Sequence, residues 1–168
     1  MSTATLATAA GPGVGIGEIA ASGDPGLVIS ALGLGSCIGV VMADHLARVA
    51  GMAHVMLPQS RAGATGPPGK FADTAVPALV ESLLRLGADR TRLVATIAGG
   101  AQMFSAGSGG GLFNIGERNE AAVRAALSAA RLRVRAADVG GGSGRTMRVR
   151  VDTGTVTVRV VGGRPVEL

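Results

Sequence analysis

The sequence predicts one α+β domain with mixed β-sheets and with helices packed on one side. The chain of 168 residues is 47% hydrophobic, which is enough for one sizeable core. Short apolar runs bounded by glycine are interspersed with two helical patterns, without a regular βαβ rhythm. The C-terminal part alternates apolar and polar residues, which is typical of half-buried antiparallel strands. Because Trp and Tyr are absent, the core must be aliphatic.

The N-terminal half reads as a tail followed by strands. Residues 1–12 are small and unpatterned, so we expect a disordered tail and a domain that spans residues 13–168. A loop rich in Gly and Pro is expected over residues 61–70. Buried strands are predicted over residues 14–20, 27–32, 38–43 and 48–57, the last two forming a hairpin around residues 44–47.

Two helices are predicted after residue 70. The first begins near Asp73 or Thr74, either of which can cap it, and Gly87 ends it. The second spans residues 117–130, with Val123 and Leu127 among its inward side chains. Between the helices we expect a buried strand over residues 93–98 and a glycine-rich loop over residues 105–112.

Alternating strands complete the chain. They are predicted over residues 131–136, 147–151 and 155–160, with a hairpin turn at residues 152–154. The formal charge is +5, and the surplus lies after residue 116, where ten Arg face five acids. The exposed positions of these strands carry several arginines: Arg133, Arg135, Arg148, Arg150 and Arg159. We favour a solvated sheet face for them; the alternative is a dock for an acidic partner.

Cysteine and charge usage indicate a cytoplasmic protein. One cysteine allows no internal disulfide, and no Lys or Arg precedes Arg48, so no signal peptide is expected. The uncharged residues 26–43 approach the length of a membrane span. Glycine and serine interrupt this stretch, so two buried strands with a turn fit better and no membrane insertion is predicted.

The candidate chemistry centres on a glycine-flanked thiol. Cys37 lies in a turn between Gly33 and Gly39, where a substrate can approach the sulfur and backbone N–H groups are available for an oxyanion hole. His54 lies on the next apolar strand of the hairpin, and a thiol beside an imidazole can act as a cysteine hydrolase. Both residues also have ordinary interpretations, as a small buried hydrophobe and as a hydrogen-bonded core histidine. His45, beside Asp44 in the hairpin turn, is expected to be exposed.

Other kinds of site lack the residues they need. No stretch completes GxGxxG, and no P-loop lysine follows a glycine run. One Cys and two His do not make a zinc cluster, so no metal or cofactor is predicted. Nucleic acid is not an expected partner, because there is no aromatic platform and no recognition-helix motif.

Five blocks, in order along the chain, resemble the chemoreceptor glutamine deamidases of bacterial chemotaxis, the CheD family: residues 33–37 (GLGSC), 53–58 (AHVMLP), 69–75 (GKFADTA), 99–104 (GGAQMF) and 114–119 (NIGERN). The resemblance implies an α/β/β sandwich with Cys37 as nucleophile and His54 as general base. It implies that the substrates are glutamine side chains on the cytoplasmic helices of methyl-accepting receptors, which become glutamates. It also implies an inhibitory partner, a CheC-type phosphatase.

The chain departs from the family pattern at one position. The resemblance implies a third catalytic residue, a threonine six positions before the cysteine, where this chain has Ala31. Ser30 is adjacent but points to the opposite strand face, so it can replace the threonine only if a bulge shifts the register. Otherwise a backbone carbonyl or a water is left to orient His54. Glycines around residues 107–111 resemble a local insertion. Two hypotheses follow: an active receptor deamidase, or a weak or inactive binding module that contacts receptors or the phosphatase.

Overall fold

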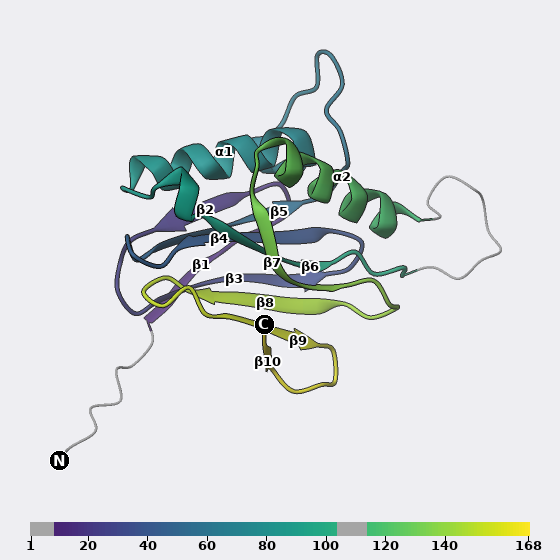
Figure 1. The fold of residues 1–168 in the computed structure, drawn as a ribbon. Helices are drawn as coiled ribbons and strands as arrows, with labels where there is room; N and C mark the ends of the chain where they lie inside the picture. Colours follow the sequence, from purple (N-terminus) through teal and green to yellow (C-terminus); the bar gives the residue numbers. More distant parts are fainter. Residues whose placement is uncertain (1–8, 104–113) are drawn as a thin grey trace.

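The computed structural model describes residues 9–103 and 114–168. Figure 1 shows three layers: two α-helices, a sheet beneath them, and a second sheet below the first. The helices are α1 (Ala72–Arg85) and α2 (Ile115–Ala129), and both pack on the same face of the middle sheet. The short 3₁₀ helices η1 (Pro68–Lys70) and η2 (Arg90–Arg92) lie on either side of α1 in sequence. The predicted α/β/β sandwich with helices on one side is confirmed.

The middle sheet is buried on both faces. Its strand order is β2-β5-β4-β6-β7, comprising Ile19–Ser22, Val49–Val55, Ile38–Asp44, Val94–Gly99 and Arg133–Val139. Neighbouring strands are antiparallel except β6 and β7, which are parallel, so the sheet is mixed. Every residue of β4 and of β5 is buried. Cover on both faces explains why these two strands are continuous apolar runs rather than alternating ones.

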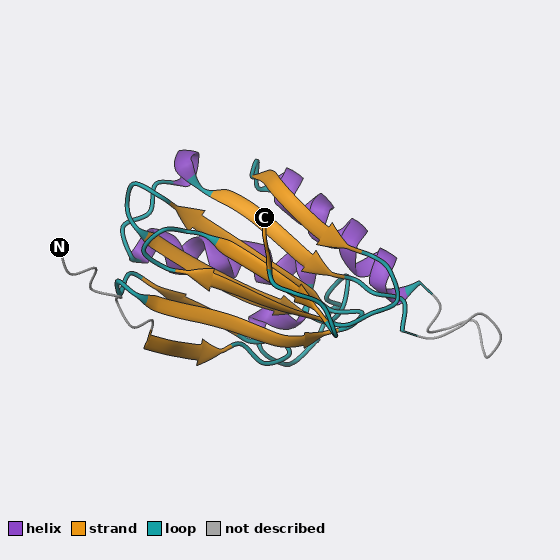
Figure 2. Ribbon diagram, turned by 90° about the horizontal axis from the view of Figure 1, so that it is seen from below, coloured by secondary structure: helices purple, strands orange, loops and turns teal. Residues whose placement is uncertain are grey.

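The outer sheet covers the other face of the middle sheet. Its order is β1-β3-β8-β9-β10, comprising Ala9–Gly13, Leu27–Leu34, Arg145–Arg150, Val156–Val160 and Val166–Glu167. Figure 2, seen from below, shows its strands in front of the helices. In β8 and β9 the buried residues alternate with more exposed ones, because one face of this sheet meets solvent.

Two apolar cores separate the three layers. The helix-side core contains Ile38 and Val40 of β4, whereas Val41 of the same strand belongs to the core between the sheets. On β5, Ala53 faces the helices and Met52 faces the outer sheet. Successive side chains of a strand point to opposite faces, so each residue's parity assigns it to one of the two cores.

Several predicted boundaries are wrong at the N-terminus. Residues 1–8 of the predicted tail lie outside the described residues, but residues 9–13 form β1, which pairs in parallel with β3. The predicted strand over residues 14–20 is instead a turn that leads into β2. Composition suggested a tail because small residues carry no strand pattern; pairing with β3 makes this segment a strand.

The direction of one predicted strand is wrong. The sequence predicts an antiparallel strand near residues 131–136, but this strand is β7, and it runs parallel to β6. Period-two alternation indicates that one face of a strand is covered, but it does not indicate whether the neighbouring strand is parallel or antiparallel.

The predicted loop over residues 105–112 and the proposed insertion lie outside the described residues. Residues 26–43 contain β3 and β4, and in the described parts of the chain no helix is long and apolar enough to cross a membrane.

The first helix begins without a side-chain cap. Phe71 is its N-cap residue, and the predicted caps Asp73 and Thr74 lie inside the first turn. The Asp73 carboxylate accepts hydrogen bonds from the backbone N–H and hydroxyl of Ser60, and the Thr74 hydroxyl donates to Pro68 O. These side chains therefore tie the preceding loop to the helix.

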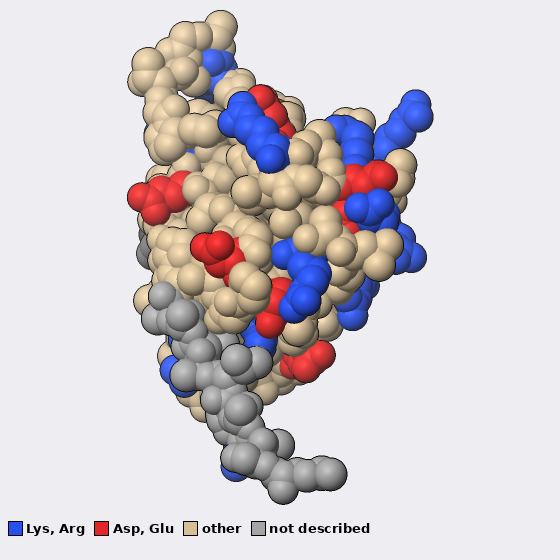
Figure 3. All heavy atoms as spheres, turned by 90° about the vertical axis from the view of Figure 1, so that its left-hand side faces the viewer, with Lys and Arg blue, Asp and Glu red and all other residues tan. Residues whose placement is uncertain are grey.

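The arginines do not form one surface. Arg133 and Arg135 lie on β7 at the edge of the middle sheet, whereas Arg148, Arg150 and Arg159 lie on the outer sheet. Arg150 is paired with Asp152. Figure 3, which views the left-hand side of Figure 1, shows basic side chains interspersed with acidic ones. The solvated-face interpretation fits this distribution, because no single sheet face carries all five.

A buried carboxylate ties the far end of β4 to η2. Asp44 is 1% exposed and accepts hydrogen bonds from the backbone N–H groups of Leu46, Ala47 and Asp89 and from the Arg92 guanidinium. Burial raises the pKa of Asp44, but the hydrogen bonds from Arg92 and from the backbone outweigh burial and lower the pKa from 3.8 to about 2.

This pKa predicts an acid-sensitive contribution to stability. Because the folded-state pKa lies below the unfolded one, the contribution is complete above pH 3.8 and is lost as pH falls toward 2. We expect Asp44→Asn to lower the free energy of unfolding at pH 7 by up to about 2 kcal/mol, since Arg92 is partly solvated. The deficit should narrow below pH 3.8 in urea titrations. Glu81→Gln, which removes an exposed helix pair, is the control; equal deficits at all pH values would contradict the assignment.

Candidate active site

The Cys37 turn is where the chain crosses from the outer sheet to the middle sheet. It connects β3 to β4, and Gly33 adopts a positive φ of +67° as the chain turns. The end of β6 packs against the turn: Gly100 N donates to Cys37 O at 2.9 Å. A Cβ on Gly99 would lie 2.1 Å from Cys37 O, so only glycine permits this approach. The turn is therefore held by backbone contacts.

His54 reaches the same layer as Cys37. In the β4–β5 ladder His54 is paired with Gly39, two residues after Cys37. By parity, His54 faces the outer sheet together with Met52, and Cys37 belongs to the same inter-sheet core. At Gly39 a Cβ would come within 2.8 Å of Met147 Sδ, so the missing side chain leaves room for the outer sheet to close over this layer. The structure thus places the two predicted site residues in the same layer between the sheets.

The His54 ring is oriented by a backbone carbonyl. Nδ1 lies 3.0 Å from Val14 O, and because a carbonyl only accepts, Nδ1 carries the proton. In the neutral ring Nε2 is then the nitrogen without a proton; it is buried and has no hydrogen-bond partner among the described residues. The His54 backbone is held by the same turn, accepting from Gly17 N and donating to Glu18 O.

This carbonyl provides the orienting group that Ala31 cannot. Val14 N donates to Ser30 O at 2.7 Å, so Val14 is fixed to β3 beside the fully buried Ala31. Of the orienting groups that the sequence leaves open, which are Ser30, a backbone carbonyl and a water, the structure provides the backbone carbonyl. Residues 14–18, which the sequence predicts as part of a strand, form a turn instead. The Val14 carbonyl therefore accepts from His54 rather than from a neighbouring strand.

The Cys37 thiol is in its neutral form at rest. Cys37 is 8% exposed, and burial raises the pKa of its thiol above the ordinary value. No hydrogen bond joins Cys37 to His54 among the described contacts, although catalytic contacts of this kind often tighten only when substrate is bound. A thiol that stays protonated needs a base to remove its proton during attack.

Asn119 ends the fifth block of the family resemblance, but no role is predicted for it from the sequence. It is fully buried on α2, and its Nδ2 donates to Ser36 O and to Met56 O, each at 2.9 Å. It therefore connects the residue before Cys37 with the end of the strand that carries His54. Asn119 precedes Val123 by four residues and Leu127 by eight, so helical periodicity places it on the same inward face of α2. This spacing could have indicated that Asn119 is buried.

His45 lies away from this site. As predicted, it is exposed, and its Nδ1 lies 2.9 Å from Thr153 O at the opposite end of β4 from Cys37. The imidazole that shares a layer with Cys37 is therefore that of His54.

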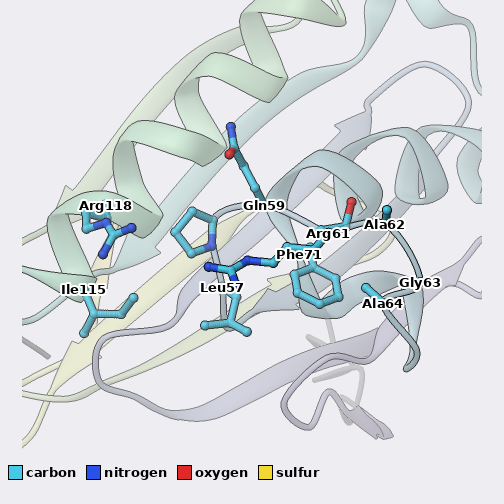
Figure 4. A pocket seen from close by; sticks show the side chains of 11 residues that line it. Leu57, Gln59, Arg61, Ala62, Gly63, Ala64, Phe71, Ile115 and Arg118 are labelled. Carbon is cyan, nitrogen blue, oxygen red and sulfur yellow. The ribbon is translucent and has the colours of Figure 1, made fainter. Parts of the chain in front are cut away.

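A groove of about 550 Å³ lies beside the site but does not contain Cys37 or His54. Figure 4 shows Ile115 and Arg118 on one wall, residues 62–64 on the other, and Leu57 and Phe71 between them. Its position follows from the chain: Leu57 and Arg118 each adjoin a residue of the Asn119–Met56 hydrogen bond. Arg118 and Arg61, which also lines the groove, make no ion pair within the described part of the chain.

A glycine-flanked thiol and an oriented imidazole between two sheets are the features of a thiol-dependent hydrolase. Comparison with known proteins is more specific: the chain belongs to the CheD family. The family model described as CheD chemotactic sensory transduction matches residues 56–160.

Relatives extend this match over most of the chain. The chain is 48% identical over 150 residues to the chemoreceptor glutamine deamidase CheD of Thermotoga maritima, covering 89% of this chain and 92% of that one. It is 44% identical over 151 residues to the probable chemoreceptor glutamine deamidase CheD of Symbiobacterium thermophilum, with the same coverages. Among solved structures, Bacillus licheniformis hypothetical protein YfiH matches with a TM-score of 0.41 and 12% identity, over 64% of this chain and 46% of that chain. The two relatives carry enzyme names, in agreement with the predicted amidohydrolase.

The Val14 carbonyl predicts the effect of restoring the family threonine. Ala31→Thr should leave the pH dependence of Cys37 alkylation unchanged, because His54 Nδ1 already has an acceptor. Ala31→Val is the matched control, with the same shape but no hydroxyl. Alkylation of all three proteins by iodoacetamide should still rise with pH beyond the ordinary thiol range, since burial raises the Cys37 pKa. A lower midpoint for the threonine variant alone would show that the carbonyl is an inadequate substitute.

Proposed function

We propose that this protein hydrolyses glutamine side chains of chemotaxis receptors to glutamate, with Cys37 as nucleophile and His54 as general base. The observation that carries the proposal is the hydrogen bonding of the His54 ring. Its Nδ1–H donates to Val14 O, and Nε2, which has no partner among residues 9–103 and 114–168, is left to act as a base in the layer that contains Cys37. Family membership supplies the substrate class, because the relatives are named for chemoreceptor glutamine.

In the first half of the reaction, His54 Nε2 takes the Cys37 proton as the sulfur attacks the carboxamide carbon. The C=O electron pair moves to oxygen and forms a tetrahedral oxyanion. When this intermediate collapses, the C–N bond breaks, and the imidazolium gives its proton to the leaving ammonia. A thioester between Cys37 and the glutamyl side chain remains.

In the second half, water replaces the thiol. His54 Nε2 takes a proton from the water as its oxygen attacks the thioester carbon, and the C–S bond breaks. The proton returns to Cys37, and the side chain leaves as glutamate. The net reaction consumes one water and releases one ammonia, so it needs no cofactor. Val14 O keeps the ring in one tautomer through both halves.

The groove beside the site is where we place the receptor segment that flanks the target glutamine. Its apolar floor, Leu57 and Phe71, suits the apolar side of a helix. Arg61 and Arg118 are available to pair with acidic side chains on the same segment. A substrate on the cytoplasmic helices of receptors places the protein in the cytoplasm.

A binding module is the second candidate. Its support is the raised pKa of the Cys37 thiol together with the absence of a hydrogen bond to His54 within the described contacts. Such a protein would contact receptors, or a CheC-type phosphatase, without turning over glutamine. The first experiment below separates the two candidates.

The direct test is incubation of the protein with receptor cytoplasmic fragments, followed by mass spectrometry of glutamine-containing peptides. Deamidation replaces an amino group by a hydroxyl and produces a defined mass increase. Cys37→Ser should lower the rate by about three orders of magnitude or more, because a hydroxyl is a far weaker nucleophile. Ser36→Ala, which alters the neighbouring side chain, should retain activity. No mass change with any cognate receptor would favour the binding module, and full activity of Cys37→Ser would exclude the proposed nucleophile.

The groove gives a prediction for substrate affinity. Arg118→Gln should raise KM for the receptor fragment several-fold at low salt and leave kcat unchanged, because the side chain contacts flanking residues and not the reacting amide. Arg124→Gln on the same helix, where the arginine is paired with Glu120, is the control. An unchanged KM for the Arg118 variant at every salt concentration would remove the groove from the substrate path.

A further inference from the structure

Asn119 is a buried polar side chain that the proposed mechanism does not use. Both of its hydrogen bonds go from Nδ2 to carbonyls, those of Ser36 and Met56. Because carbonyls only accept, they establish which end of the carboxamide is the nitrogen. The other end, Oδ1, is buried and has no partner in the described parts of the chain. A buried polar atom without a partner is unfavourable, so packing alone does not explain an asparagine at this position. The two hydrogen bonds from Nδ2 indicate a role in holding the Ser36 and Met56 carbonyls.

The turn that carries Cys37 is anchored at three successive carbonyls. Gly35 O accepts from Ala101 N at 2.8 Å, and Cys37 O accepts from Gly100 N at 2.9 Å. The carbonyl between them, Ser36 O, accepts from the Asn119 side chain at 2.9 Å. Two of the anchors are backbone contacts that the chain path supplies. The third anchor is different, because the Asn119 side chain holds the carbonyl of the Ser36–Cys37 peptide and so controls the orientation of that peptide.

That orientation determines where the Cys37 N–H points. In a trans peptide the C=O and the following N–H point in opposite directions. Since Ser36 O is directed at Asn119 on α2, the Cys37 N–H is directed away from α2. It donates to no residue within 9–103 or 114–168. A free backbone N–H on the nucleophile itself is a typical donor to the oxyanion of acyl transfer.

We infer that Asn119 is a positioning residue, which holds the Ser36–Cys37 peptide so that Cys37 N–H donates to the oxyanion formed when the sulfur attacks a carbonyl carbon. The inference rests on the proposed function, since it concerns the same thiol. In the step concerned, the S–C bond forms and the carbonyl electron pair moves to oxygen. The N–H stabilises that charge, and Asn119 itself touches neither substrate nor sulfur.

Two reactions of Cys37 separate this role from a general structural one. Acylation by p-nitrophenyl acetate passes through an oxyanion, whereas alkylation by iodoacetamide displaces iodide without one. Asn119→Leu removes both hydrogen bonds and the unpaired oxygen while keeping a similar volume. We expect it to slow acylation about a hundredfold and to leave the alkylation rate and its pH profile within about twofold of wild type. Cys37→Ser measures background acylation.

Val123→Ala is the matched control. Val123 is fully buried one turn further along the same face of α2, and its apolar side chain cannot donate a hydrogen bond to either carbonyl. It should lower the thermal midpoint through a cavity and leave the ratio of acylation to alkylation at the wild-type value. If Asn119→Leu does not fold, the smaller Asn119→Ala undergoes the same comparison.

The outcomes are distinct. A selective loss of acylation in the Asn119 variant supports the inference. Unchanged acylation overturns it, and so does a parallel loss of acylation and alkylation, which would mean that the turn has collapsed as a whole. Neither probe needs a receptor, so the result is independent of whether the wild-type protein deamidates receptor glutamine.

Discussion

The burial of the middle sheet on both faces is the constraint on which the rest of the structure depends. Strands β4 and β5 are covered by helices on one side and by the outer sheet on the other, so no residue of either strand meets solvent. Polar chemistry is therefore confined to the ends of these strands or to side chains whose hydrogen bonds are supplied internally. Cys37 precedes β4, Asp44 ends it, and His54 lies one residue before the end of β5.

Buried polar groups lie at both ends of β4, and they differ in how fully they are hydrogen-bonded. The Asp44 carboxylate is buried, and Arg92 and three backbone N–H groups donate hydrogen bonds that compensate its burial. At the other end, burial raises the pKa of the Cys37 thiol, and His54 Nε2 has no hydrogen-bond partner in the part of the chain that the structure describes. A satisfied polar group stabilises the fold, whereas an unsatisfied base close to a thiol is available for a reaction.

Backbone atoms carry much of the site. Val14 O orients His54, and the N–H groups of Gly100 and Ala101 anchor the Cys37 turn. This explains how a chain with alanine in place of the family threonine retains an oriented imidazole. A carbonyl fixed by β3 accepts from Nδ1 as a hydroxyl oxygen would, and no substitution of the Val14 side chain removes it. Asn119 is the side-chain exception, and it acts on a backbone carbonyl.

The sequence by itself determined the layered α/β/β architecture, most of the strands, both helices and the family, and it singled out Cys37 and His54 as the candidate site residues. Apolar runs and periodicity report how each element is covered, and a motif reports residue types at fixed spacing. Tertiary structure alone decided that β1 is a strand, that β7 runs parallel to β6, and that Val14 O and Asn119 hold the site. These features depend on which backbone groups meet across long sequence separations. A carbonyl is present at every residue, so nothing in a side-chain pattern marks the one that will accept.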